Sequence, residues 1–229
     1  MAGGAGRVLR WRHKVKASVV HLADDPRDTP IYSVLEAADY VGVPRGTLRH
    51  WIKPTKKYRA AIETDGGCLS FYNLLEAHVL RVSLEREAWL QRIRAGVETL
   101  RERLPNSKHP LLELELSTSK GYRSLFTTTV TGEVENLSFG GQFEFKHFLK
   151  RYLSRIDIDK SGMYQLRPFG YSHVAINHRV SGGRPVVRGT GVLVEFIAKR
   201  VRSGETIDVI AFDHNISRAD VREALKYSA

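Results

Sequence analysis

Apolar residues between positions 31 and 53 recur at the three- and four-residue spacing of helices, and a short break divides them into two runs. Gly42 lies at this break, where the first helix must end, because glycine enters the left-handed backbone region without strain. The second run places Leu48, Trp51 and Ile52 on one face of a helix. The pattern predicts two short helices joined by a tight turn, a helix-turn-helix.

Polar and small residues support both helices. Ala37 and Ala38 are small enough for the second helix to cross the first closely. Ser33 and Glu36 match the S-x-x-E capping box, in which each side chain satisfies a free backbone N–H at the helix start. Pro44 has the backbone angle of the first turn of the next helix. The exposed faces of that second helix carry Arg45, Gly46, Arg49, His50 and Lys53. A short helix with cations along one side, behind a tight turn, is typical of a helix that enters a DNA major groove.

A hairpin is predicted directly after the helix-turn-helix. Residues 58–62 and 68–71 have the composition of short strands, and residues 65–67, Asp-Gly-Gly, have that of a turn. Such a hairpin would form a wing beside DNA, with four cations near the phosphates: Lys53, Lys56, Lys57 and Arg59. Two amphipathic helices are expected next, over residues 72–82 and 87–104. Their expected inward residues are Leu74, Leu75, Val79 and Val82 in the first, and Leu90, Ile93, Val97, Leu100 and Leu104 in the second.

This order of elements resembles the MerR and excisionase class of winged DNA-binding domains over residues 30–104. The resemblance implies that the second helix enters the major groove of double-stranded DNA. Arg45, Thr47 and Arg49 are then the candidate contacts to bases or phosphates. His50 either touches a phosphate or packs under the wing, and packing is the favoured interpretation.

Residues 111–170 predict a packed α+β module. The β-branched and aromatic stretch YRSLFTTTV can form a hairpin with EVENLSF. An amphipathic helix follows, with an apolar side made of Phe145, Phe148, Leu149, Tyr152 and Ile156. A second hairpin is expected around Ser161 and Gly162. No residues with recognisable chemistry stand out in this module.

Three short helices are predicted near the C-terminus. The first spans residues 193–202, Thr206 begins the second, and Ser217 with Asp220 begins the third. Their expected inward residues are Phe196, Ile197 and Val201, then Ile207, Ile210 and Ala211, then Val221, Ala224 and Leu225. The last helix also carries three cations at four-residue spacing: Arg218, Arg222 and Lys226.

The chain is strongly basic, and its excess charge is uneven. It has 229 residues with 36 Lys and Arg against 25 Asp and Glu, a formal net charge of +11. Residues 1–59 hold 12 of these basic side chains and 5 of the acidic ones. Such a field favours nucleic acid, an acidic protein or an anionic membrane as partner, and its location at the helix-turn-helix favours nucleic acid.

Location and membrane association follow from composition. Cys68 is the single cysteine, which excludes a disulfide within the chain and makes a reducing cytoplasm the expected location. No apolar run reaches the roughly 18 residues of a transmembrane helix, so no membrane partner is expected. Residues 1–28, basic at first and turn-rich at the end, are expected to form a flexible tail.

Common motifs of catalysis and metal binding are missing. The segment SGGRPVVRGTG has neither a following Lys-Ser/Thr nor the G-x-G-x-x-G spacing, so it predicts a structural loop instead of a phosphate loop. The nine histidines include no H-E-x-x-H and no Cys/His cluster, and no G-x-S-x-G elbow occurs. We therefore expect no catalytic residues, no metal and no cofactor.

The C-terminal sequence, from about residue 171 to 229, resembles the DUF433 family. The family pattern G-x-P-V-x-x-G-T, followed by G-x-(S/T)-x-x-x-(I/L) and A-L-x-Y-(A/S), is met by Gly183, Pro185, Val186, Gly189, Thr190, Gly204, Thr206, Ile210, Ala224, Leu225 and Tyr227. Gly191 departs from it where arginine is expected, so the polar contact of that arginine is not expected here.

Joined to the winged helix-turn-helix and to the segment ENLSFGGQ, this resemblance extends to VapB-type antitoxins of type II toxin–antitoxin systems. It implies a homodimer on operator DNA and a partner toxin with a PIN-like ribonuclease fold. Arg218, Arg222 and Lys226 are then candidates for toxin binding or a second DNA contact. Solvated surface or toxin contact is favoured over base readout for this stripe.

The expected fold is mainly helical α+β, with a tail (1–28), a winged helix-turn-helix (29–110), a central α+β module (111–170) and a three-helix, helix-turn-helix-like unit (171–229). The predicted function is a non-enzymatic antitoxin that represses its own operon. Two alternatives stay open: a free-standing MerR-like transcription regulator that senses a ligand or protein, and a nuclease or modifying enzyme. The lack of a carboxylate pair with metal spacing argues against the enzyme.

Overall fold

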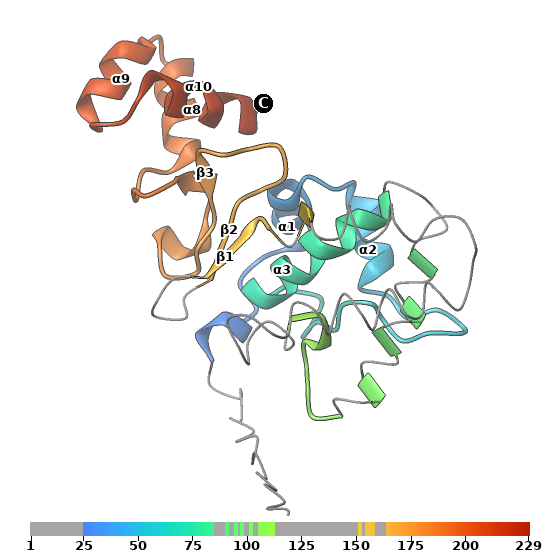
Figure 1. Ribbon diagram of the computed structural model, residues 1–229. Coiled ribbons are helices and arrows are strands. Elements are labelled where there is room, and N and C mark those ends of the chain that lie inside the picture. Colours follow the sequence, from blue (N-terminus) through green and yellow to red (C-terminus); the bar gives the residue numbers. More distant parts are fainter. Residues whose placement is uncertain are drawn as a thin grey trace, which may run out of the picture.

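The computed structural model describes residues 25–84, 105–112, 154–158 and 164–229, with positions 90–91, 94–95, 97–98, 101–102 and 151–152 between them. It confirms a mainly helical α+β fold (Figure 1). A larger body contains the N-terminal helices, and a smaller unit at one end of the molecule contains the C-terminal helices (Figure 1). Short 3-10 helices occur at η2 (Pro26–Asp28), η3 (Arg81–Leu84) and η4 (Ser181–Gly183).

Two helices, α1 (Val34–Val41) and α2 (Arg45–Trp51), occupy the predicted positions on either side of a tight turn. The capping box is present, with the Glu36 N–H donating to Ser33 Oγ at 3.2 Å and the Ser33 N–H donating to Glu36 Oε2 at 2.9 Å. Gly42 ends α1 with a φ of 66°, the left-handed conformation predicted for it. The local sequence therefore determines where α1 begins and ends.

The inward residues of these two helices are also as predicted. Ala37 and Ala38 of α1 are completely buried, and so are Leu48 and Trp51 of α2. Ile52, the C-cap of α2, is half-buried and packs against the same core. The small alanines let α2 cross α1 closely, as their size indicates.

The two strands predicted for the wing hairpin are wrong. Residues 58–62 form no strand, because the Ala61 N–H donates to the Trp51 carbonyl at 2.8 Å and holds this segment against the end of α2. Leu69 does not pair with it either. Its backbone instead forms an isolated antiparallel bridge with Tyr32, which precedes α1. The two segments expected to pair with each other therefore pair elsewhere, one with the end of α2 and the other with Tyr32 before α1.

A tight turn does occur at the predicted position. Asp65 and Cys68 form an isolated bridge around two glycines with positive φ. Phe71 does not extend a strand, because Ser70 caps the helix α3 (Phe71–Leu80), accepting a hydrogen bond from the Asn73 N–H at 3.2 Å. The polypeptide after the turn therefore enters a helix almost at once.

α3 is the centre of the larger body. All ten of its residues are buried, which is the behaviour of a helix surrounded by other elements. The four predicted inward residues are each at most 1% exposed: Leu74, Leu75, Val79 and Val82. The hydrophobic core around α3 includes α1 and α2, and also Tyr152 and Leu166 from the central segment.

The helix predicted over residues 87–104 is helical at its described positions. Val97 is fully buried, and Leu90 packs against the core. Several predictions fall outside the described residues: the inward positions Ile93, Leu100 and Leu104, the hairpin over residues 122–139, and the side chains Phe145, Phe148 and Leu149.

A hairpin in the central segment is confirmed by β1 (Ile156–Ile158) and β2 (Tyr164–Leu166), which pair antiparallel. The helix predicted before this hairpin is too long at its C-terminal end, because it includes Ile156. Ile156 belongs to β1, where it lies opposite Leu166 and is 2% exposed. A β-branched residue fits a strand well, and its pairing there buries it as thoroughly as a helix would.

The C-terminal unit is built from β3 (Val174–Ala175), β4 (Val186–Val187), α8 (Val194–Arg202), α9 (Ile207–Asp213) and α10 (Arg218–Tyr227). It has a hydrophobic core of its own. The predicted caps are present, since Thr206 caps α9 and Ser217 forms a capping box with Asp220 at the start of α10. Capping residues in the sequence thus locate two of these three helices closely.

One predicted inward residue of the C-terminal unit is wrong. Phe196 is 45% exposed, and its ring lies edge-on to His214 with centroids 5.5 Å apart. Val194, Ile197 and Ala198 form the buried face of α8 instead, which turns Phe196 outward. The other predicted inward residues are buried or half-buried: Ile197, Val201, Ile207, Ile210, Ala211, Val221, Ala224 and Leu225.

Candidate nucleic-acid and partner interface

The outer face of α2 is polar and cationic, as the sequence predicts. Arg45, Arg49 and His50 are exposed, and so are Gly46 and Lys53. The exposure of His50 corrects the expectation that it packs inside. Thr47, the remaining candidate contact, is half-buried. Because Leu48 and Trp51 anchor the other side of the helix, these side chains are presented together on one surface.

Most cations of this surface are unpaired. Arg45 has only a loose ion pair with Asp39, with 3.7 Å between Nη2 and Oδ2. Among the described residues, no acid lies within ion-pair distance of Arg49, Lys53 or Lys56. Lys57 lies over the ring of Tyr58, with its Nζ 5.0 Å from the centroid. Unpaired, solvated cations are available for phosphate binding without first breaking an ion pair.

Arg59, the last of the predicted wing cations, is already engaged. Its Nη2 is 3.0 Å from Glu98 Oε2, and this contact raises its pKa. Glu98 also accepts a hydrogen bond from Arg101 at 2.9 Å, which places it between two arginines. Arg59 therefore ties the loop after α2 to the following helical segment, and less of its charge is available to DNA.

Two buried arginines support this surface from below. Arg94, 3% exposed, donates to the carbonyls of His50 at 2.8 Å and Arg59 at 3.1 Å. Arg101 donates to the carbonyl of Ala60 at 2.7 Å. Burial, and next the nearby Arg101, lower the pKa of Arg94. Sequence periodicity does not single out either arginine, although they lie seven residues apart, about two turns, in the helix predicted over residues 87–104.

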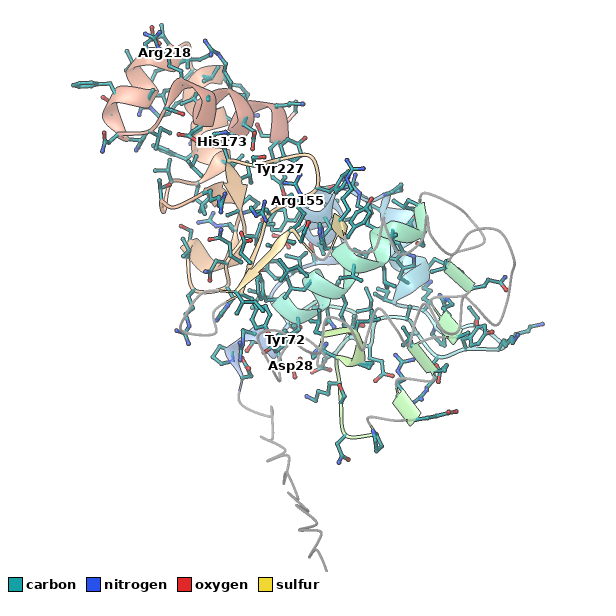
Figure 2. The ribbon with its side chains drawn as sticks, in the orientation of Figure 1. Asp28, Tyr72, Arg155, His173, Arg218 and Tyr227 are labelled. Atoms are coloured by element: carbon teal, nitrogen blue, oxygen red, sulfur yellow. The ribbon has the colours of Figure 1, made fainter. Side chains whose placement is uncertain are left out.

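A buried ionic cluster fixes the start of the described chain to α3. His109 Nε2 lies 2.8 Å from Asp28 Oδ1, and His109 Nδ1 lies 3.1 Å from Glu76 Oε2. Burial would lower the pKa of His109, but the hydrogen bonds and charges of the two carboxylates outweigh it and raise the pKa to about 9. His109 is therefore a charged bridge at neutral pH, with both ring nitrogens engaged. In Figure 2, Asp28 and Tyr72 of α3 lie next to each other.

Tyrosines join the larger body to the C-terminal unit. Tyr227, at the end of α10, donates its hydroxyl to the Tyr40 carbonyl at 2.9 Å, and Tyr32 donates to the Gly183 carbonyl at 2.9 Å. Tyr171 packs edge-on against Tyr227, with ring centroids 4.9 Å apart. Gly183 leaves no room for a side chain, because a Cβ there would lie 2.2 Å from the Tyr32 hydroxyl. The C-terminal unit is thus held directly against α1. These contacts of Tyr32, Tyr40, Tyr171 and Tyr227 are called the tyrosine joint below.

An open cleft of about 680 Å³ lies beside Tyr40 and Tyr227. It is lined by the end of α1, by α8 and by the C-terminal residues of the chain. Its charged side chains have both signs, with Asp39 and Glu195 opposed by Arg184 and Arg202. The cleft is therefore formed by α1 on one side and by the C-terminal unit on the other.

The outer end of the C-terminal unit presents cations together with apolar rings. Arg218, Arg222 and Lys226 are all exposed, and Arg218, at the far end in Figure 2, forms an ion pair with Asp208 at 2.5 Å. Phe212 of α9 is 86% exposed and Val209 is 47% exposed. An exposed phenylalanine with apolar and cationic neighbours is typical of a protein-binding surface.

Within the part of the chain that the structure describes, no group of three or more His, Cys, Asp or Glu side chains has the geometry to hold a metal ion. Over the same residues, no helix combines the length and apolar character that a membrane span requires. Cys68 is exposed and carries a free thiol. The candidate sites in the described residues are therefore surfaces of charged and hydrogen-bonding side chains.

The C-terminal unit matches a known family. Residues 174–228 match the family described as "Protein of unknown function (DUF433)", a span that runs from β3 to the end of α10. The match confirms the resemblance to this family that the pattern of glycine, proline and tyrosine residues predicts. The matched region includes Gly183 and Tyr227, whose hydrogen-bond partners Tyr32 and Tyr40 lie outside it.

Two comparisons, both with Mycobacterium tuberculosis, match most of the chain. A curated relative named "Putative antitoxin VapB45" is 28% identical over 227 residues, covering 86% of this chain and 93% of the relative. The X-ray crystal structure of Rv2018 matches with a TM-score of 0.62 and 24% identity, and it covers 86% of this chain and 98% of that chain. The second comparison shows that the fold is shared along most of the molecule.

Proposed function

We propose that this chain is the antitoxin of a type II toxin–antitoxin system, which binds operator DNA and neutralises a PIN-like ribonuclease toxin. The observation that carries the proposal is the similarity to a relative named as an antitoxin, which covers 86% of this chain and 93% of the relative. A match of this length is more than the likeness of one common motif. The role is non-enzymatic, in keeping with the cationic binding surfaces of the chain.

DNA binding is assigned to the outer face of α2 and the loop that follows it. Arg45 and Arg49 are exposed on that helix, and Lys53, Lys56 and Lys57 continue the cationic surface. The buried Arg94 holds this loop in place by donating hydrogen bonds to the carbonyls of His50 and Arg59. We expect the protein to bind as a homodimer, so that two copies of α2 read two half-sites of the operator.

Toxin binding is assigned to the C-terminal unit. Phe212 and Val209 provide an apolar contact surface, and Arg222 and Lys226 are exposed without an acidic partner among the described residues. A ribonuclease of the PIN-like fold has an acidic metal site, and arginine or lysine side chains can occupy the place of its metal or RNA. Arg218 contributes less, because Asp208 already neutralises it.

The proposal is tested by co-expressing the chain with the product of the neighbouring open reading frame. We expect a stable complex with a small ribonuclease, and operator binding by the purified protein. Replacing Lys56 and Lys57 by Ala should lower the salt slope of DNA binding by roughly two units, because about 0.9 counterion is released per phosphate contact. A chain that neither binds a ribonuclease nor binds DNA would contradict the proposal.

A second candidate function is a free-standing MerR-like regulator that senses a small molecule. The observation that favours it is the cleft of about 680 Å³ between α1 and the C-terminal unit, since a ligand there would contact the helix-turn-helix directly. Mass spectrometry of the purified native protein separates the two functions. A stoichiometric small molecule favours the sensor, whereas a co-purified ribonuclease favours the antitoxin.

A further inference from the structure

Three arginines surround the ring of Phe169, near the tyrosine joint. The guanidinium carbon atoms of Arg81, Arg151 and Arg155 lie 5.1, 4.7 and 5.9 Å from the ring centroid. The ring also stacks on Tyr152, with centroids 4.7 Å apart and an interplanar angle of 20°. These four residues, Phe169 with its three arginines, are called the Phe169–arginine cluster below.

The cluster has an unbalanced positive charge. Among the residues that the structure describes, none of its arginines is within ion-pair distance of an acid. The nearest acids are engaged elsewhere, because Asp157 binds Arg167 through contacts of 2.7 and 3.0 Å. Glu223 accepts hydrogen bonds from the backbone N–H groups of Ser172 and His173.

Burial and the nearby like charges both disfavour the charged form of Arg155. Burial lowers the pKa of Arg155, and the nearby charges of Arg167 and Arg151 lower it further, while Glu223 and Asp157 compensate only in part. Contact with an aromatic face offsets some of the repulsion. An anion bound among the guanidinium groups would remove the remaining repulsion.

The geometry favours a phosphate as this anion. A guanidinium group has its N–H donors in its own plane, so contact with a ring face leaves those donors free to bind oxygen atoms. Arg81 uses one donor on the Val41 carbonyl and Arg155 uses one on the Tyr171 carbonyl, both at 2.8 Å. The side chain of the exposed Arg151 has no hydrogen-bond partner among the described residues.

The position of the cluster relates it to the helix-turn-helix. Arg81 reaches the last residue of α1 through Val41, and its Nη1 lies 2.9 Å from the place of a Cβ on Gly42. α2 begins three residues after Gly42, so the cluster adjoins the turn that leads into the recognition helix. In Figure 2, Arg155 lies at the junction of the larger body and the C-terminal unit, near Tyr227.

We propose that the Phe169–arginine cluster binds a backbone phosphate of the DNA that α2 reads, one flanking the bases in the major groove. The inference rests on the proposed DNA binding and extends the interface from α2 to residues 151–169. Because Arg155 also holds the Tyr171 carbonyl, and Tyr171 packs on Tyr227, this phosphate contact connects the DNA to the joint with the C-terminal unit.

The test uses the full chain and a fluorescein-labelled duplex of mixed sequence, since a phosphate contact does not depend on sequence. Arg151→Gln should lower the salt slope of binding by about 0.9 and weaken binding roughly five-fold at about 0.15 M salt. Arg151→Lys should retain most of the slope, because it keeps the charge. Arg179→Gln is the matched control, an exposed arginine with no acidic partner among the described residues, and it should leave the slope unchanged.

Each contrary result has a distinct meaning. An unchanged slope for Arg151→Gln, measured beside a reduced slope for Lys56→Ala, would overturn the cluster assignment and leave the proposed DNA binding intact. Loss of ribonuclease inhibition with unchanged DNA binding would also overturn it, in favour of an acidic protein surface. Binding of inorganic phosphate in calorimetry that Arg151→Gln abolishes, with DNA binding unaffected, would assign the cluster to a free anion. Failure of the wild-type chain to bind any duplex would refute the proposed DNA binding itself.

Discussion

The arginines near α2 divide by burial into two groups with different roles. Arg49 is exposed and unpaired among the described residues, so its charge is available to DNA. Arg94 is almost completely buried and donates to the carbonyls of His50 and Arg59. Helical periodicity predicts the first group, because the apolar residues of α2 determine which face is inward. It does not predict the second, because the partners of Arg94 lie 35 and 44 residues away in sequence.

Arg49→Ala is expected to weaken operator binding more than binding to random DNA. The exposed side chain lies one turn after Arg45 on the proposed recognition helix, and an arginine that reads a base contributes about 1–3 kcal/mol of discrimination. Competition anisotropy with both DNAs measures the difference, and Arg179→Ala serves as the control. Equal losses on the two DNAs would reduce Arg49 to a phosphate contact.

His109 illustrates a residue whose role depends on tertiary structure. Nothing in the local sequence marks it, since Glu76 is 33 residues away and Asp28 is 81 residues away. From the sequence, His50 is a candidate phosphate contact or packing residue, and the histidines match no metal motif. In the folded chain His109 joins two carboxylates across the larger body, and its pKa is about 9 against an ordinary value of 6.5. Its protonation is therefore linked to stability.

Stability should fall in alkaline solution because of this bridge. A group whose pKa is raised by folding stabilises fully below its unfolded pKa, here about 6.5, and loses the contribution as the pH rises through about 9. The contribution is on the order of 3 kcal/mol. Urea unfolding from pH 6 to pH 10 should show this decline in the wild type and a smaller one in His109→Gln. Parallel pH profiles for the two proteins would contradict the charged bridge.

The α1–α2 pair and the predicted wing show what local sequence patterns do and do not determine. The ends of α1 follow from Ser33, Glu36 and Gly42, whose capping interactions are contained within the element. Residues 58–62 have strand-like composition, but their backbone hydrogen bonds with the end of α2 prevent the predicted pairing. A strand requires a partner, and the partner of Leu69 is Tyr32, far from the predicted hairpin. The sequence therefore predicts helices here better than strand pairing.

Gly42→Ala is expected to destabilise the chain by roughly 1–2 kcal/mol, because its φ of 66° is costly for a residue with a Cβ. The new Cβ would also lie 2.9 Å from Arg81 Nη1, whose side chain must shift. The matched control is Gly46→Ala in α2, where no atom lies within 4 Å of a new Cβ. That substitution should stabilise by about 0.5–1 kcal/mol. Urea unfolding measures both, and equal effects would contradict the role of Gly42.

At the scale of the whole molecule, two hydrophobic cores meet at the tyrosine joint. Val174 belongs to the smaller core, whereas Ile176 belongs to the larger one and pairs with Leu166 through backbone hydrogen bonds of 2.8 and 2.9 Å. The chain thus crosses between the cores within three residues. The family pattern predicts the C-terminal unit well, because its caps and glycines are local. The pattern does not predict the joint, which depends on hydrogen bonds such as Tyr227 to Tyr40 across 187 residues.

This arrangement should allow the two proposed binding functions to be separated by substitution. Arg45 and Arg49 lie on α2, whereas Arg222 and Lys226 lie on α10 of the other unit. Replacing the α2 pair by Ala should abolish operator binding and leave toxin inhibition intact. Replacing Arg222 and Lys226 by Glu should do the reverse, because the change places acids against the acidic site of a ribonuclease.

Antitoxin function is tested most directly by titrating RNA cleavage by the ribonuclease from the neighbouring open reading frame. Increasing amounts of the wild-type chain, and of the double variant Arg45→Ala/Arg49→Ala, are added to a fixed amount of enzyme and labelled RNA. We predict that cleavage stops near an equimolar ratio with both proteins. Undiminished cleavage at a large excess of the wild-type chain would contradict the proposal that this protein neutralises the toxin.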